Sequence, residues 1–212
     1  DVASNVTVYI NGAEQSDKKT ALSKVDLKAG DQIEVFENDD NEAETVAVIR
    51  YQLAKIDEVE SKLSNTYTKQ GATYSITLKD LNDQGIGGTY YDVYDADSDK
   101  ELTGFDADTY KADTVLAVAM KGNVVLASNV ADSTSGKITA YNTGSKANIT
   151  LDGNKYALHA TVNMSNTGDV DYQKASFNLD DSTYTVYTDK NGYVIGIDET
   201  EATKIDDVYY VT

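Results

Sequence analysis

The sequence predicts an all-β protein, built from tandem small antiparallel β-barrel or sandwich modules of about five strands each. Its apolar residues occur in short runs rich in Val, Ile and Tyr rather than in long Leu-rich helical stretches. Clusters of Asn, Asp and Gly separate these runs, as expected for turns. Strand-like words also recur in the same order along the chain, which indicates a repeat.

The clearest recurring element is a hairpin. It joins residues 30–36 to 45–49 through the turn 38–41. Its two relatives join 112–118 to 124–127 through the turn 121–123, and 181–187 to 193–197 through the turn 189–192. Each turn contains residues that tolerate positive φ, and such a turn between two β-rich runs is the strongest local signal of a hairpin.

Two shorter sequence segments, called words below, recur together with this hairpin. Words that start with Lys-Ile occur at Lys55, Lys137 and Lys204, and each is predicted to begin the first strand of a unit. A strand that ends at Asn11-Gly12 has a counterpart that ends at Asp152-Gly153. Both dipeptides are typical of tight two-residue hairpin turns.

These recurrences divide the chain into modules. Residues 1–54 are predicted to be the C-terminal part of a first β-module, 55–136 a second module and 137–212 a third. The segment 204–212 either closes the third module at its sheet edge or begins a further unit; alternatively, the first and last segments complete each other. The chain is therefore expected to be a piece of a longer array.

Charge and composition narrow the class of protein. The chain has 36 acidic and 18 basic residues, so its net charge is −18. The electrostatic field of so negative a protein repels nucleic-acid phosphates and anionic lipids, so we expect neither nucleic acid nor membrane as a partner. The absence of Cys excludes a disulfide framework, a thiolate metal site and a cysteine nucleophile.

One acidic segment has the spacing of metal ligands. Asp95, Asp97 and Asp99 alternate along the chain, and Asp106 follows as a closing carboxylate. These four residues are the candidate ligands of a calcium loop. However, Lys100 occupies the turn position that usually requires Gly, and the closing ligand is Asp instead of a bidentate Glu. These departures favour a solvated acidic loop between strands, and no other cofactor is predicted.

The residues do not suggest catalysis, and the chain is predicted not to be an enzyme. His159, the sole histidine, lies in the alternating run 156–162, and no nucleophile-elbow motif is present to pair with it. A solvent-facing strand position is expected for it. Paired carboxylates are abundant, but a glycosidase pair needs a larger cleft than units of this size supply easily.

Tyrosine dominates the aromatic residues, with 16 Tyr against 3 Phe and no Trp. In Tyr90-Tyr91 and Tyr209-Tyr210 the neighbouring rings fall on opposite sheet faces, so one ring of each pair can be exposed. Exposed rings form carbohydrate-binding platforms, whereas buried rings form strand cores. Without Trp, cross-strand Tyr pairs that stabilise the sheet are the expected arrangement.

Residues 115–123 (VLAVAMKGN), 136–141 (GKITAY) and 184–195 (YTVYTDKNGYVI) carry the repeated words. They resemble the repeat region of S-layer-type surface proteins of gut Clostridia and related Firmicutes, in which surface-layer homology domains anchor β-modules to the cell wall. The Trp-containing helical motifs of those anchors are not expected in this chain. The resemblance implies a non-catalytic spacer role at the bacterial cell surface, outside the cell. Its expected partners are other copies of the protein or glycans of host or cell wall; the alternative function is an adhesin segment or carbohydrate-binding module.

Overall fold

The computed structural model describes residues 2–15, 27–62, 73–81, 83–92, 94–95, 100–101, 110–122, 124–143, 146–162 and 182–200. Within these ranges the chain forms strands β1 to β17 and no helix, which confirms the predicted all-β class. The described strands form small sheets, none of which closes into a barrel, so the modules are sandwich-like. No helix of the described residues is long and apolar enough to cross a bilayer.

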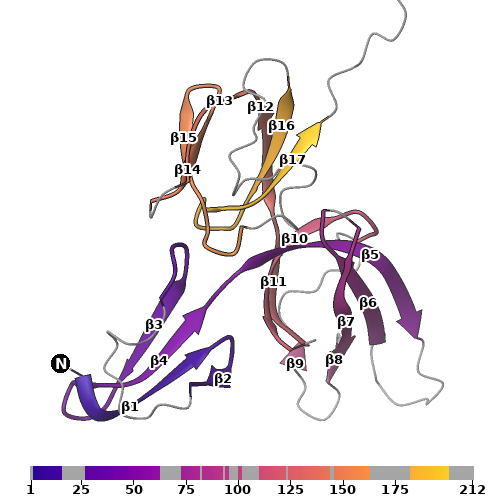
Figure 1. Ribbon diagram of the computed structural model, residues 1–212. Coiled ribbons are helices and arrows are strands. Elements are labelled where there is room, and N and C mark those ends of the chain that lie inside the picture. The colour runs from indigo at the N-terminus through magenta and orange to yellow at the C-terminus, as the bar shows by residue number, and fades with distance from the viewer. Residues whose placement is uncertain are drawn as a thin grey trace, which may run out of the picture.

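The first sheet contains β1 (Val2–Ile10), β2 (Ala13–Glu14), β3 (Gln32–Glu37) and β4 (Ala43–Ile49), in the order β2-β1-β4-β3 (Figure 1). The predicted tight turn joins β1 to β2, with φ of 46° at Asn11 and 69° at Gly12. The central strands β1 and β4 pair in parallel, which differs from the antiparallel arrangement expected within a module. Alternate valines of these two strands bury one face of the sheet.

The second sheet contains β5 (Gln52–Lys62), β6 (Thr73–Lys79), β7 (Gly85–Asp92), β10 (Val115–Lys121) and β11 (Val124–Val130), in the order β11-β10-β5-β6-β7. A short ribbon of β8 (Tyr94–Asp95) and β9 (Lys100–Glu101) follows β7. Along β5 and β10 side chains are buried on both faces. Ala54 and Leu116 belong to one core cluster, whereas Leu53 and Ala117 belong to another.

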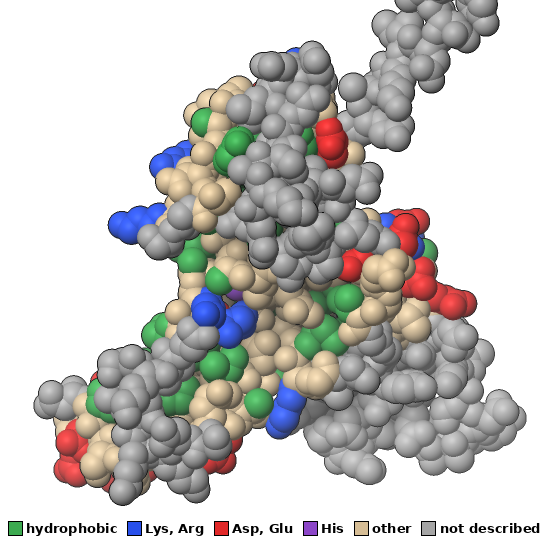
Figure 2. Space-filling view, viewed as in Figure 1, with side chains coloured by type: hydrophobic (Ala, Val, Ile, Leu, Met, Phe, Trp, Pro, Cys, Tyr) green, Lys and Arg blue, Asp and Glu red, His purple; other side chains and the backbone are tan. Residues whose placement is uncertain are grey.

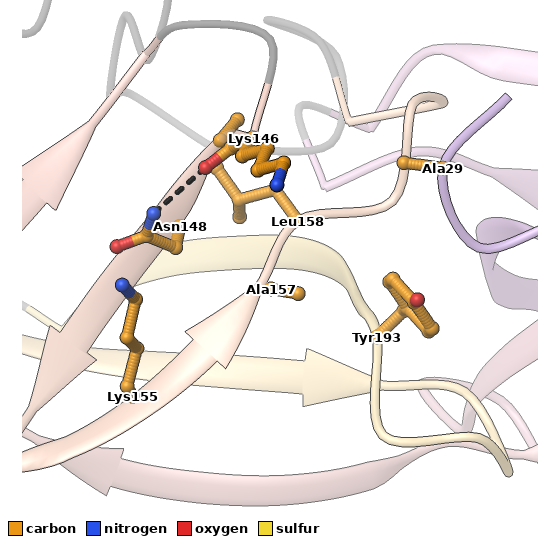
Figure 3. Close-up of a pocket in the computed structure, with 8 residues that line it drawn as sticks. Ala29, Lys146, Asn148, Lys155, Ala157, Leu158 and Tyr193 are labelled. Atoms are coloured by element: carbon orange, nitrogen blue, oxygen red, sulfur yellow. Dashed lines mark hydrogen bonds between the residues drawn. The ribbon is translucent and has the colours of Figure 1, made fainter.

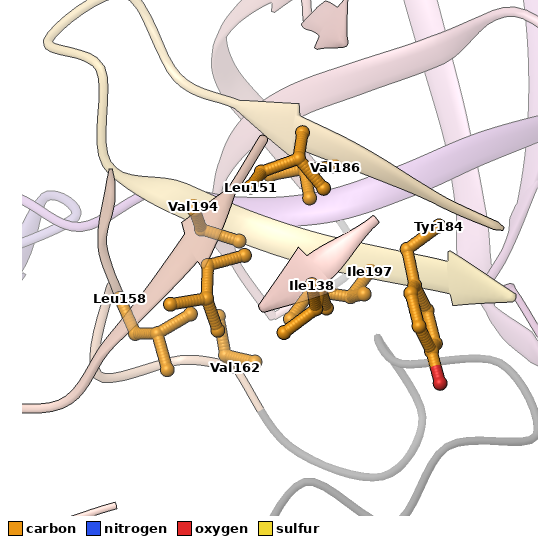
Figure 4. Close-up of a cluster of buried hydrophobic side chains, with 9 residues drawn as sticks. Ile138, Leu151, Leu158, Val162, Tyr184, Val186, Val194 and Ile197 are labelled. Atoms are coloured by element: carbon orange, nitrogen blue, oxygen red, sulfur yellow. The ribbon is translucent and has the colours of Figure 1, made fainter. Parts of the chain in front are cut away.

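The third module is a sandwich of two sheets. One contains β12 (Asp132–Gly136), β16 (Thr183–Thr188) and β17 (Val194–Thr200), and the other contains β13 (Ile138–Asn142), β14 (Asn148–Leu151) and β15 (Asn154–Ala157). Figure 4 shows Ile138 and Leu151 of one sheet packed with Val186 and Ile197 of the other. Tyr184 lies in the same core and is fully buried.

Strand pairing places some predicted boundaries differently. Residues 132–136, assigned to the second module from sequence, form β12 and pair with β16 of the third. Lys55 lies inside β5, whereas Lys137 directly precedes β13. These two Lys-Ile words therefore do not mark the same position of a strand, and Lys204 lies outside the described residues. The overall division into modules stays a prediction.

One turn motif recurs once in each module, headed by Asn38, Asp80 and Asp189. In each, the backbone N–H of the heading residue donates to the carbonyl of the residue four positions later, over 2.9 Å. The side-chain Oδ1 of the heading residue accepts a hydrogen bond from the backbone N–H of that same later residue, also over 2.9 Å. A side chain that satisfies the turn's own backbone donor explains why Asn or Asp heads all three.

The residue three positions after the head of each turn is left-handed: φ is 57° at Asn41, 58° at Asp83 and 79° at Gly192. The first and third turns are the hairpin relatives predicted from sequence. The second connects β6 to β7 and was not predicted, because its sequence, 80–84, lacks the Gly or paired Asn of the others. The predicted relative at 121–123 is a tighter turn between β10 and β11, with Gly122 at φ 59°.

Candidate functional site at the module junction

The modules are joined by very short connections. Arg50 and Tyr51 alone separate β4 from β5, and Ala131 alone separates β11 from β12. Neither connection contains Gly or Pro, and both Tyr51 and Ala131 are buried. Buried, short connections leave little backbone freedom between neighbouring sheets.

An apolar cluster spans these connections, and we call it the junction cluster. Its buried members are Tyr51, Leu53, Ala117, Ala119, Ala131 and Ile195. Ile195 belongs to β17 of the third module, whereas Leu53 and Ala117 belong to the second sheet. Ile49 of β4, in the first sheet, packs against the same cluster. Three of the sheets therefore contribute side chains to one continuous apolar core.

Asn11, at the tip of the β1–β2 turn, fixes the first sheet to the second. Its Oδ1 accepts a hydrogen bond from Arg50 N over 2.8 Å, and its Nδ2 donates to Arg50 O over 3.0 Å. The same Nδ2 lies 3.2 Å from Met120 O of β10. The Arg50 guanidinium in turn forms a bidentate ion pair with Asp31, with both contacts at 2.7 Å. These contacts hold the connection between β4 and β5 on both sides.

The loop before β3 and the segment after β15 form the contact between the first and third modules. Ala160 N donates to Ala29 O over 3.0 Å, and His159 N donates to Val194 O over 2.8 Å. Thr161 Oγ1 donates to Tyr51 O over 2.9 Å. The bonds from Ala160 and Thr161 fix the third module against the first module and the β4–β5 connection, whereas the bond from His159 to Val194 lies within the third module.

His159 lies at the centre of this contact and is 2 % exposed. The expectation of a solvent-facing position is therefore wrong, because the alternating pattern of a strand does not reveal that another module covers its outer face. Nδ1 of the ring lies 3.1 Å from Thr161 N and 2.9 Å from Thr161 Oγ1. Nε2 lies against Gly30 and forms no well-aligned hydrogen bond with the described residues.

Burial of the ring lowers the pKa of His159 below its ordinary value, because the charged imidazolium is poorly solvated there. The carboxylates of Asp189 and Asp31 oppose this shift, whereas the Arg50 guanidinium adds to it. The neutral ring is thus the form that the junction accommodates. A ring so enclosed cannot reach a substrate, so its role at this site is in packing.

Asp189 stands beside His159 at the start of the β16–β17 turn and is 1 % exposed. Its Oδ1 accepts hydrogen bonds from Asn191 N and Tyr193 N, both at 2.9 Å. These bonds place the Tyr193 ring 6.4 Å from the His159 ring, edge to face. The turn that heads this hairpin therefore also shapes the wall of the junction.

Two surface hollows lie next to the junction. One, of about 490 Å³, is lined by Ala29, Lys146, Ala147, Asn148, Lys155, Ala157, Leu158 and Tyr193 (Figure 3). The other, of about 380 Å³, lies between the first and second sheets and includes Phe36, Ala47 and Leu126. Phe36 is 54 % exposed and Leu126 is 49 % exposed, so this second hollow has an apolar rim.

The predicted calcium ligands are not brought to this junction. Asp97, Asp99 and Asp106 lie outside the described residues, and Asp95 is described only as part of the backbone of β8. Within the described ranges, no group of three metal-ligating side chains comes together. The calcium loop stays a prediction, which a calcium titration followed by thermal unfolding tests directly.

Sequence reasoning missed most residues of the junction. Tyr51, Asp31 and Arg50 carry no motif, and their partners lie far away in the chain. The one available signal was the dipeptide Asn11-Gly12, whose turn was predicted but whose side-chain contacts across modules were not.

No protein-family model matches this chain, and no curated protein is similar to it in sequence.

Proposed function

We propose that this chain is a non-catalytic spacer segment of an exported bacterial cell-surface protein of the S-layer type, in which consecutive β-modules are held in a fixed relative orientation. The junction cluster carries this proposal, because Tyr51, Leu53 and Ile195 from different modules share one buried core. Modules joined only by flexible linkers have no such core. The net charge of −18 adds an anionic exterior that favours solubility.

The positions of the tyrosines also support a structural role. A carbohydrate-binding platform requires exposed aromatic rings arranged along a sheet face. The tyrosines whose side chains are described are all buried or half-buried: Tyr9, Tyr51, Tyr110, Tyr141, Tyr156, Tyr184, Tyr187 and Tyr193. Buried and half-buried rings of this kind pack within the sheets, and this supports the spacer over an adhesin or carbohydrate-binding module.

The experiment that tests the proposal measures the distance between modules. The chain has no Cys, so Glu44→Cys and Asn154→Cys introduce a unique pair of spin labels at exposed positions in the first and third modules. We expect a narrow distance distribution by pulsed electron resonance. The pair Ser133→Cys and Asn154→Cys, within the third module, is the control. An inter-module distribution much broader than the control would overturn the proposal.

The cellular location needs its own test. An antibody raised against the chain is expected to label intact cells of the source organism. Labelling that appears only after the cells are permeabilised would contradict a surface location, whatever the rigidity of the modules.

A further inference from the structure

The hollow beside β14 and β15 combines an apolar floor with two lysines. Ala29, Ala147, Ala157 and Leu158 form apolar parts of its lining, and Lys146 and Lys155 contribute basic side chains. Figure 3 shows Asn148 and Lys155 on one side of the hollow and Tyr193 on the other, with Ala157 between them. Asn148 Nδ2 donates to Lys146 O over 2.7 Å, which fixes the backbone that carries Lys146. Its volume, about 490 Å³, lies within the range of ligand sites.

Both lysines of this hollow are exposed and form no ion pair with the described residues. Elsewhere in the described chain, Arg50, Lys55 and Lys79 are neutralised by neighbouring Asp side chains. Two unpaired cations beside an apolar floor, on a molecule of net charge −18, form a local site for an acidic group.

A cluster of acidic side chains lies in the first sheet of the same chain, away from the hollow. The β3–β4 turn contains Asp39 and Asp40, flanked by Glu37 and Glu42. Asn38 Oδ1 accepts hydrogen bonds from Asp40 N at 3.0 Å and Glu42 N at 2.9 Å, so the turn is ordered before any partner arrives. Asp39 and Asp40 are exposed, and their carboxylates form no ion pair with the described residues.

This turn cannot reach the hollow of its own molecule. Asp31, at the start of β3, is bound to Arg50 at the junction, and the turn lies beyond the other end of the strand. A six-residue strand such as β3 spans about 20 Å. Figure 2 shows the same separation on one face, with acidic side chains at the lower left end and basic side chains beside β14 and β15 at the upper left.

We propose that the hollow lined by Lys146, Lys155 and Tyr193 receives the acidic β3–β4 turn of a second copy of the chain, so that copies associate head to tail. The two surfaces differ from each other and lie at separate ends, so the contact is heterologous and extends into a row of molecules. The biological purpose of this association rests on the proposed spacer role, but the contact itself does not. Association and inter-module rigidity are measured separately, so either can fail alone.

Sedimentation over a series of protein concentrations tests the contact. The buffer should have an ionic strength of about 0.15 M, because a Debye length of roughly 8 Å screens the long-range repulsion between two anionic molecules more than a direct contact. We expect the average mass of the wild-type chain to rise with concentration. Reversing the hollow with K146E/K155E, or the turn with D39K/D40K, should weaken association by about tenfold or more, because like charges then face each other.

A mixture of the two reversed variants gives the decisive result. The acidic hollow of one then faces the basic turn of the other, and the remaining pair of surfaces keeps its original complementarity, so the mixture should associate although neither variant does so alone. Lys111→Glu, at an exposed site away from the hollow, is the charge control and should associate like the wild-type chain. Circular dichroism confirms that each variant is folded.

Three outcomes would overturn the proposal: a wild-type chain that stays monomeric, reversed variants that associate like the wild type, or a mixture that does not recover association. Adding an acidic polysaccharide such as polygalacturonate distinguishes another occupant. If it binds through Lys146 and Lys155 while the chain alone stays monomeric, the hollow is a site for acidic glycans and not for a second copy.

Discussion

Gly30 and His159 are in direct contact across the boundary between the first and third modules. A Cβ atom built on Gly30 would lie 2.1 Å from Cδ2 of the His159 ring, and the backbone of Gly30 has φ of 90°. The backbone of one module thus approaches the buried ring of another closely enough that only glycine fits. The close packing of the junction therefore depends on the His159 side chain and on the absence of a side chain at Gly30.

Gly30→Ala should therefore destabilise the protein by roughly 2 to 4 kcal/mol, from the left-handed backbone and from overpacking against a ring that cannot move into solvent. Gly122→Ala is the matched control. It also has positive φ, 59°, but its Cβ would meet nothing within 4 Å. We expect it to cost about 1 kcal/mol. Equal losses in urea unfolding of the two variants would show that the His159 contact is unimportant.

The stability of the junction should depend on pH through His159. Its pKa is lowered in the folded state, so the unfolded chain binds the proton more readily and stability falls as the pH decreases. The loss should begin near the ordinary histidine pKa of about 6.5 and be complete below the folded value. Urea unfolding measured between about pH 7.5 and 5 tests this, since the carboxylates titrate mostly at lower pH.

His159→Gln provides the comparison for this pH dependence. The variant should be less stable than the wild-type chain at neutral pH because it loses ring packing. It should also lose the decrease in stability between about pH 7 and 5. A variant with an unchanged pH profile would assign the effect to other groups.

Asp189 should be the most important of the three turn-heading residues, because it is 1 % exposed and also shapes the junction. Asp189→Ala removes the acceptor of two backbone hydrogen bonds and should cost roughly 2 to 4 kcal/mol. Asp189→Asn keeps an acceptor in the same place and should retain most of the stability. Asn38→Ala, in the equivalent but more exposed turn, should cost about 1 kcal/mol. Thermal and urea unfolding compare the three.

Asn11 should contribute to inter-module rigidity through its side chain. Asn11→Gly keeps the positive φ accessible but removes the hydrogen bonds to Arg50 and Met120, at a cost of about 1 to 3 kcal/mol. Asn41→Gly is the control, because Asn41 also has positive φ, 57°, but lies in an exposed turn. Spin labels at positions 44 and 154 lie on opposite sides of the junction. Only Asn11→Gly should broaden the distribution of distances between them.

The edge strand β3 should tolerate charge. Ile33 and Val35 are 45 % and 50 % exposed, and β3 lies at the edge of its sheet. Val35→Lys should change stability by no more than about 1 kcal/mol, while slowing aggregation, because a charged edge resists pairing with another strand. Light scattering at elevated temperature measures the aggregation rate. Faster aggregation of this variant would indicate that Val35 packs more tightly than its exposure suggests.

Local sequence alone determined the strand content and several turns of this protein. The alternation of β-branched residues indicates strands, because it depends only on the period of a pleated chain. The turns at Asn11-Gly12, Asp152-Gly153 and 189–192 were predicted correctly, since positive φ and a side chain that bonds its own backbone are properties of a few adjacent residues.

Only the tertiary structure decided which surfaces meet. The parallel pairing of β1 with β4 and the burial of His159 depend on segments far apart in the chain, and no local pattern encodes their docking. Tyr51 and Asn11 likewise gain their roles from neighbours in other modules. Local backbone preferences therefore fixed the strands and turns, whereas the burial of apolar surface between distant segments fixed how the modules are joined.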